Sequence, residues 1–148
     1  SKAYLERVEQ WPRVIAQDAA KAPHTHVQIT PVSHLYNTTI NDAMGALLME
    51  CAEKFACDGI APPRKDCGST DFGAVTHRLP SCCLRVKTIE TDDPPHTDAW
   101  EKTGNEARAH QGIYDGAVCC ALAAFRLVTD EAAWQDVCQC LLAHQKEN

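Results

Sequence analysis

Several signatures of common function classes are missing from this sequence. It has no cluster of five or more lysine or arginine residues, and 20 acidic against 14 basic side chains give a formal net charge of -6. Such a chain has no basic stripe that could neutralise phosphates, so we do not expect nucleic acid as a partner. The longest apolar stretch, residues 116–127, is well short of the roughly 20 residues that cross a bilayer, so we expect no membrane span.

The cysteines also lack the arrangement that zinc sites and redox proteins use. None of the nine cysteines forms a C-x-x-C pair, and the odd number leaves at least one of them free. Most lie in stretches that we predict to be helix or strand, namely Cys51, Cys82, Cys119, Cys120, Cys138 and Cys140. Free cysteine behaves there as a small hydrophobic residue, so we predict reduced structural thiols and a cytoplasmic protein.

What the chain does contain is typical of one globular domain. Of its 148 residues, 45% are hydrophobic and 23% are charged, and a chain of that length buries roughly 70% of its unfolded surface. Apolar residues at helical spacing predict helices over residues 4–21, 39–57 and 112–129, and another helix after Asp130. Pro12 should kink or restart the first helix. Thr39 and Asp42 resemble a capping box at the start of the second.

Other stretches have the pattern of strands. Residues 26–30 alternate with period two, and residues 72–79 and 82–89 look extended, with Pro80 between them. We therefore predict an α/β fold, with helices packed on a small mixed sheet that contains parts of 72–79 and 82–89. Because so few strands leave an edge and a face of the sheet uncovered, we also predict self-association or a second chain.

Histidine offers the first candidates for chemistry. His24 and His26 lie on the same face of an extended segment and could chelate a metal. An isolated H-x-H pair, however, more often binds no metal. His96 follows two prolines and precedes Thr97 in a loop before the last long helices. Such a stiff loop can hold an imidazole at the carboxyl edge of a sheet, where open α/β folds bind ligands. No further metal ligand stands near His96 at a zinc-motif spacing, so a structural role is the other interpretation.

A polar loop offers the second candidate site. Gly68, Ser69 and Thr70 bring a glycine, two hydroxyls and consecutive backbone amides, which could receive a carboxylate or an oxyanion. Taken alone, the same residues are equally a turn into a strand. The loop lacks the lysine of a phosphate loop, and the chain lacks a G-x-S-x-G elbow, so Ser69 is a poor candidate nucleophile.

Residues 68–81 read Gly-Ser-Thr-Asp-Phe-Gly-Ala-Val-Thr-His-Arg-Leu-Pro-Ser, and a predicted strand and then His96-Thr97 follow before an alanine-rich helix. This series resembles the carboxyl-terminal part of the zinc-dependent aminoacylase and carboxypeptidase family. The nearest branch is the amidohydrolases that act on N-acyl amino acids, dipeptides and p-aminobenzoyl-glutamate. Residues 4–30 resemble the end of that family's lid domain, and residues 36–42 resemble its return into the catalytic domain.

The resemblance implies a division of the chain and roles for its site residues. Residues 1–36 would be the lid-like helix and strand, and residues 37–148 the carboxyl-terminal part of the catalytic domain. His96 would be the last ligand of a site for zinc or a similar divalent metal, and the loop Gly68 to Thr70 would line the substrate pocket. The family's other metal ligands and its glutamate general base have no counterpart in these 148 residues. Cys82-Cys83 replaces an Ile-His-Pro-like run, which changes the adjacent pocket wall.

Two function hypotheses follow. In the first, the chain is the carboxyl-terminal portion of a metal-dependent amidohydrolase, a metallopeptidase-like hydrolase that cleaves amide bonds of N-acyl amino acids or dipeptides, and its partner is the missing amino-terminal half. In the second, it is a shortened descendant without the metal site. It would then be a small metal-independent enzyme, with His96 as a general acid or base, or a binding or assembly module. Where no second chain is present, we expect a homodimer.

Overall fold

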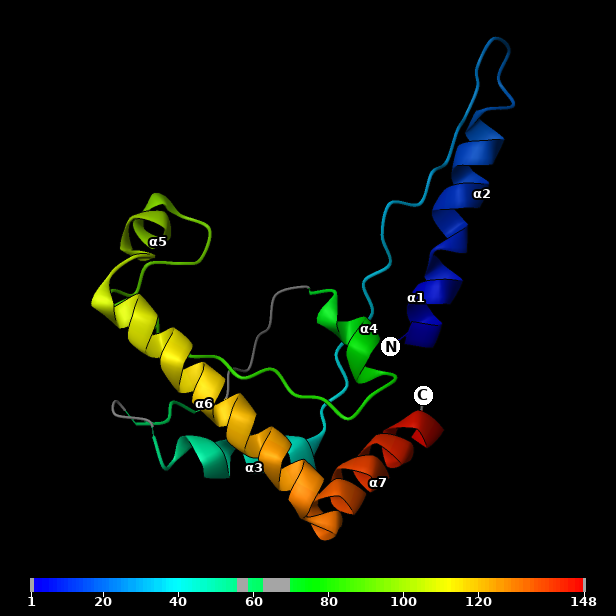
Figure 1. Cartoon of the computed structure of the whole chain (residues 1–148). Helices are drawn as coiled ribbons and strands as arrows, with labels where there is room; N and C mark the ends of the chain where they lie inside the picture. Colours follow the sequence, from blue (N-terminus) through cyan, green and yellow to red (C-terminus); the bar gives the residue numbers. More distant parts are fainter. Residues whose placement is uncertain (1, 56–58, 63–69, 148) are drawn as a thin grey trace.

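The computed structural model describes residues 2–55, 59–62 and 70–147, and their regular structure is helical (Figure 1). The described helices are α1 (Lys2–Val8), α2 (Gln10–Ala19), α3 (Asp42–Ala52), α4 (Phe72–Thr76), α5 (Asp98–Thr103), α6 (Ala107–Thr129) and α7 (Glu131–Glu147). α6 and α7 meet in a V at Asp130, and α3 packs against both of them. α5 was not predicted from the sequence.

The predicted α/β fold is wrong, because no strand or sheet occurs among the described residues. Residues 72–76, at the start of one predicted strand, form the helix α4. Residues 26–30 and 82–89 lie outside the helices, but within the described ranges neither stretch pairs with another in a ladder.

The stretch 82–89 lies against α6 instead of against another strand. A Cβ atom added to Gly112 would come within 2.5 Å of the carbonyl oxygen of Lys87, and one added to Gly116 would contact the side chain of Val86. Ile89 is buried. A segment with one face on a helix shows the same alternation of apolar and polar residues as a half-buried strand, and this explains the wrong prediction.

The core lies where α3, α6 and α7 meet. Leu47, Leu48 and Cys51 of α3 are buried together with Ala123 of α6, and Val137 of α7 is only 1% exposed. The helices predicted over 39–57, over 112–129 and after Asp130 are therefore confirmed as α3, α6 and α7. α3 is shorter than predicted and α6 longer, and residues 56 and 57 lie outside the described ones.

The ends of these helices show how the sequence sets their bounds. Asn41 is the N-cap of α3, since its side-chain oxygen accepts a hydrogen bond from the amide nitrogen of Met44 at 2.9 Å. The predicted capping box of Thr39 and Asp42 is wrong, because the Thr39 hydroxyl donates to the carbonyl oxygen of Thr76. α7 begins as predicted, with the Asp130 carboxylate accepting hydrogen bonds from the next turn.

Residues 2–35 form an arm that stands away from the core (Figure 1). The predicted helix over 4–21 is confirmed, although it is broken at Glu9 into α1 and α2. Pro12 lies in the first turn of α2, where its missing N–H group costs no intrahelical hydrogen bond. Neither helix buries a residue. The division of the chain near residue 36 stays a prediction.

Candidate functional site

Of the predicted substrate loop, Gly68 and Ser69 lie outside the described residues, and Thr70 is exposed. The Thr70 hydroxyl accepts a hydrogen bond from the amide nitrogen of Phe72 at 3.3 Å. It thus supports the turn that leads into α4. A turn was one of the two interpretations of this loop from the sequence, and ligand binding was the other. The hydroxyl keeps its access to solvent.

His96 stands in a turn that other side chains fasten on both sides. The Thr97 hydroxyl donates to the carbonyl oxygen of Pro94 at 3.0 Å, and the indole nitrogen of Trp100 donates to the carbonyl oxygen of Asp93 at 2.8 Å. His96 itself is exposed. Its imidazole makes no hydrogen bond or ion pair with the rest of the described chain, so the turn presents the ring to solvent.

The backbone of His96 is in the left-handed region, with a φ of 67°. This conformation costs a residue other than glycine roughly 1–2 kcal/mol, although histidine adopts it more readily than most. The hydrogen bonds of Thr97 and Trp100 hold the turn in place against that cost. His24 has the same backbone conformation, with a φ of 66°, so the conformation alone does not distinguish His96; the two hydrogen bonds that fasten its turn, from Thr97 and Trp100, do.

The described residues do not by themselves complete the metal site that the resemblance implies. They contain no group of three or more His, Cys, Asp or Glu side chains that could hold an ion, whereas a catalytic zinc takes three protein ligands and an open position. No hydrogen bond joins His96 to Thr70 within the described ranges. His24 and His26 are exposed near the tip of the arm. We therefore derive no step through a metal.

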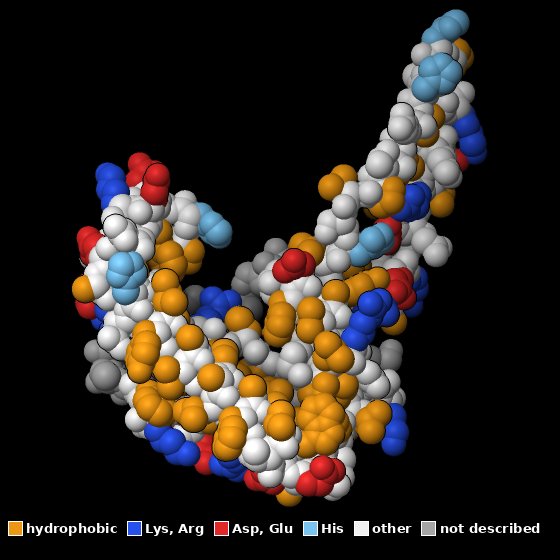
Figure 2. All heavy atoms as spheres, in the orientation of Figure 1, with side chains coloured by type: hydrophobic (Ala, Val, Ile, Leu, Met, Phe, Trp, Pro, Cys, Tyr) orange, Lys and Arg blue, Asp and Glu red, His pale blue; other side chains and the backbone are white. Residues whose placement is uncertain are grey.

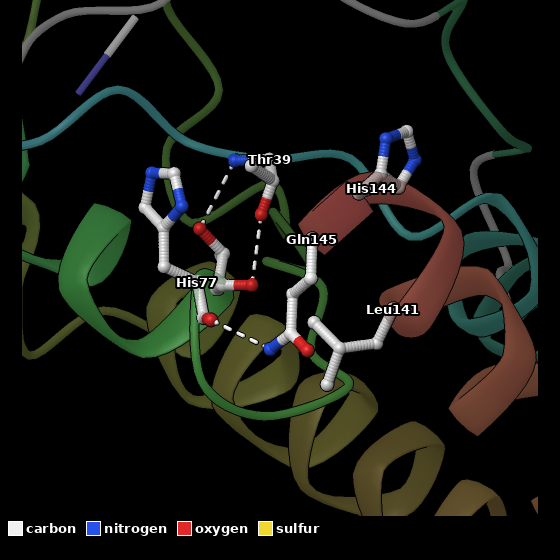
Figure 3. A pocket seen from close by; sticks show the side chains of 6 residues that line it. Thr39, His77, Leu141, His144 and Gln145 are labelled. Carbon is white, nitrogen blue, oxygen red and sulfur yellow. Dashed lines mark hydrogen bonds between the residues drawn. The ribbon is translucent and has the colours of Figure 1, made fainter. Parts of the chain in front are cut away.

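A polar cluster that the sequence analysis missed joins three distant segments (Figure 3). The Thr76 hydroxyl accepts from the amide nitrogen of Thr39 at 3.0 Å, and Gln145 of α7 donates to the carbonyl oxygen of His77 at 3.0 Å. The Nε2 atom of the His77 ring forms a hydrogen bond of 3.0 Å with the carbonyl oxygen of Asn37. The carbonyl partner places the ring proton on Nε2.

This cluster is built for stability and not for catalysis. The hollow between Thr39, Thr76, His77, Leu141, His144 and Gln145 measures about 10 Å³, close to the space that one water molecule needs. Thr76 and His77 belong to the motif 68–81, but their partners Thr39 and Gln145 are 37 and 68 residues away in the chain. Such pairs leave no signal in a single sequence.

A larger groove runs along the arm. It measures about 340 Å³ and is lined by Glu9, Pro12, Arg13, Ala16, Ile29 and Pro31. The hydrogen bond from Arg13, at 2.8 Å, lowers the pKa of the Glu9 carboxyl, and His34 lies 3.4 Å from the same group. The groove therefore combines a mostly apolar wall with the ion pair of Arg13 and Glu9.

The seven described cysteines are free thiols, namely Cys51, Cys82, Cys83, Cys119, Cys120, Cys138 and Cys140. Burial raises the pKa of the Cys119 thiol, and the nearby Cys51 acts in the same direction. A thiol of raised pKa is a poor nucleophile, so Cys119 acts as a core residue.

No protein-family model matches this chain, and neither a curated protein nor a solved structure matches it. The resemblance of residues 68–81 and His96-Thr97 therefore remains the ground for a function.

Proposed function

We propose that this chain is the carboxyl-terminal portion of a metal-dependent amidohydrolase acting on N-acyl amino acids or dipeptides. The observation that carries the proposal is the turn at His96, which is the position that matches the family's last metal ligand. The ring is exposed, and its strained backbone is held by Thr97 and Trp100. In this proposal the chain supplies one imidazole, and the other ligands and the general base belong to the missing half.

The packing of residues 82–89 supports the need for that half. One side of the stretch lies on α6 at Gly112 and Gly116, while most of its other residues are exposed. Its backbone makes no hydrogen bond to other described backbone groups, so the N–H and C=O groups on its exposed side are available to pair with a second chain. Helices with an unpaired extended segment along them form one layer of a domain, and a second layer from a partner would complete it.

The loop that begins at Gly68 is the proposed contact with substrate. Its amides and the hydroxyls of Ser69 and Thr70 would bind the carboxylate of an N-acyl amino acid, because backbone N–H groups and hydroxyls are donors that suit an anion. The exposed Thr70 leads directly into α4. The Thr39–Thr76 hydrogen bonds fix α4 to the segment that enters α3, so the helix that follows Thr70 is held in place.

The native protein, isolated from its own cells by affinity capture of this chain, tests the proposal. We expect an assembly heavier than copies of this chain alone, with a second polypeptide or a longer one, and with bound zinc or a similar divalent ion measured by elemental analysis. A native protein built of 16.3 kDa chains alone, without metal and without activity on N-acyl amino acids, would contradict the proposal. Hydrolysis by that protein which a chelator leaves unchanged would support the metal-independent alternative instead.

A further inference from the structure

One face of α6 is left uncovered, and hydrophobic side chains gather there (Figure 2). The bulky ones are Ile113, Tyr114, Phe125 and Val128, which are 63%, 62%, 64% and 86% exposed. Between them lie the small exposed residues Ala117, Cys120, Ala121 and Ala124. These eight residues form the apolar face of α6, and no charged side chain belongs to it.

The opposite side of α6 is a core surface. It buries Ala109, Gly112, Cys119 and Ala123. Its charges are also on that side: Arg126 donates to the carboxylate of Glu50 on α3 at 3.0 Å. By length and composition α6 is the one described helix that could cross a membrane, but a helix with a charged, packed side and an apolar side is amphipathic, which is the pattern of a helix that docks on protein.

The order of side-chain sizes along the apolar face is symmetric about its middle. Bulky residues stand at both ends and small ones at the centre, near Cys120 and Ala121. A two-fold dimer needs a patch that is complementary to itself when its direction is reversed. In an antiparallel pair, Ile113 would lie opposite Val128 of the second copy, and the small centre would let the two helices approach closely. Antiparallel helix dipoles also attract each other.

The chain is more open than a compact monomer of its mass. The chain exposes 11121 Å², whereas a compact monomer of 16.3 kDa exposes about 7,500 Å². Part of that excess of about 3,600 Å² belongs to the arm of residues 2–35, which stands away from the core, so the total does not measure the area of the apolar face of α6.

We propose that the apolar face of α6 is the interface between two copies of this chain, with the two α6 helices antiparallel and crossing at Cys120 and Ala121. The occupant is a second copy because the size order is self-complementary and because the face carries no charge that would select a different partner. The inference does not depend on the proposed function, since it uses the side of α6 turned away from residues 82–89.

Cross-linking of the full chain tests the crossing point. Cys120 is exposed and would lie beside its own counterpart, so a short bis-maleimide should give a covalent dimer whose linked peptide contains Cys120 twice. In a Cys120→Ser background, Ile113→Cys and Val128→Cys chains should cross-link to each other when mixed. Ile113→Cys should not cross-link to itself, because the two copies of residue 113 would be about 22 Å apart along the helix axis. Self-linkage at residue 113 alone would overturn the antiparallel arrangement.

Light scattering and sedimentation test the interface itself. The wild-type chain should have twice the mass of 16.3 kDa at micromolar concentration. Ala121→Lys would place two like charges at the crossing and should weaken the dimer by more than about 100-fold. Gln111→Lys adds the same charge to an exposed position of α6 outside the face and should leave the dimer intact. Circular dichroism should show both variants as helical as the wild type.

Three results would overturn the proposal. The first is a wild-type chain that is monomeric at micromolar concentration, and the second is a dimer that Ala121→Lys leaves unchanged. The third is flotation of the wild-type chain with phosphatidylcholine vesicles, which would assign the apolar face to a lipid surface.

Discussion

The side-chain amide of Asn41 donates a hydrogen bond of 2.9 Å to the carbonyl oxygen of Val137, 96 residues away. The oxygen of the same amide caps α3 by accepting from the amide nitrogen of Met44. Asn41 is 5% exposed and Val137 is 1% exposed, so water does not replace either bond. One side chain therefore both begins α3 and fastens it to α7.

Substitutions at Asn41 separate these two roles. Asn41→Ala removes both and should lower the free energy of unfolding by about 1–3 kcal/mol, from the lost cap and the buried groups left unpaired. Asn41→Ser keeps an oxygen for the cap and should lose less. Urea unfolding followed by circular dichroism measures both variants, and equal losses would contradict a role of Asn41 as a cap.

Two glycines of α6 give a matched pair of variants. Alanine in a helix interior is usually more stable than glycine by about 0.5–1 kcal/mol. At Gly112, however, the new methyl group would press on the carbonyl oxygen of Lys87, so Gly112→Ala should lower stability by about 1–3 kcal/mol. At Gly116 it would only touch the side chain of Val86 at 3.4 Å, so Gly116→Ala should be neutral or stabilising. Thermal unfolding of the two variants checks the path of residues 82–89 along α6.

Two buried threonine hydroxyls should respond differently to their removal. The Thr76 hydroxyl accepts from the amide nitrogen of Thr39 and donates to the carbonyl oxygen of Gly73. Thr76→Val leaves the amide nitrogen of Thr39 without this partner, while the carbonyl oxygen of Gly73 keeps its hydrogen bond from the amide of His77. The substitution should cost about 1–3 kcal/mol of unfolding free energy. The Thr88 hydroxyl has no hydrogen-bond partner among the described residues, so Thr88→Val should be neutral or stabilising. Equal destabilisation of the two variants in urea unfolding would show that the cluster around Thr76 is not the source of the effect.

The start of α7 should make stability depend on pH. The hydrogen bond from the amide of Ala133 and the ion pair with Arg126 hold the pKa of Asp130 below its ordinary value of 3.8. A lowered pKa adds stability above the unfolded-state value, and that stability is lost as the pH falls through the folded-state value. Asp130→Asn should therefore be less stable than the wild type near about pH 7, and the difference should shrink as the pH falls below the ordinary pKa of Asp130, 3.8. A difference that stays constant across this range would contradict the ion pair.

The three core helices could be predicted from the sequence because each buries one apolar stripe. Leu47, Leu48 and Cys51 of α3, for example, stand at helical spacing and are buried together. The sequence predicted a sheet wrongly, because the alternation of apolar and polar residues in 82–89 fits a strand and a segment lying on α6 equally well. Residues 72–76 were predicted as extended, but the Thr76 hydroxyl donates to the carbonyl oxygen of Gly73 and accepts from the amide nitrogen of Thr39, which stabilises a helical turn.

The turn at His96 was predicted in part. The two prolines before His96 indicated a stiff loop, and the structure has a fastened turn there with an exposed ring. The positive φ of His96 and the bonds of Thr97 and Trp100 could not be foreseen, because turn geometry of this kind depends on the placement of α5. The substrate role of Gly68, Ser69 and Thr70 stays a prediction, as do the metal, the homodimer and the cytoplasmic location.

Chelator-sensitive hydrolysis of an N-acyl amino acid by the native assembly, measured with the wild-type chain and with His96→Ala expressed in its own cells, tests the central claim most directly. His110→Ala, which removes an exposed imidazole from α6, is the matched control. The account predicts hydrolysis that a chelator abolishes, that His96→Ala reduces by at least about 100-fold and that His110→Ala leaves unchanged. An assembly with full activity in His96→Ala would contradict the account.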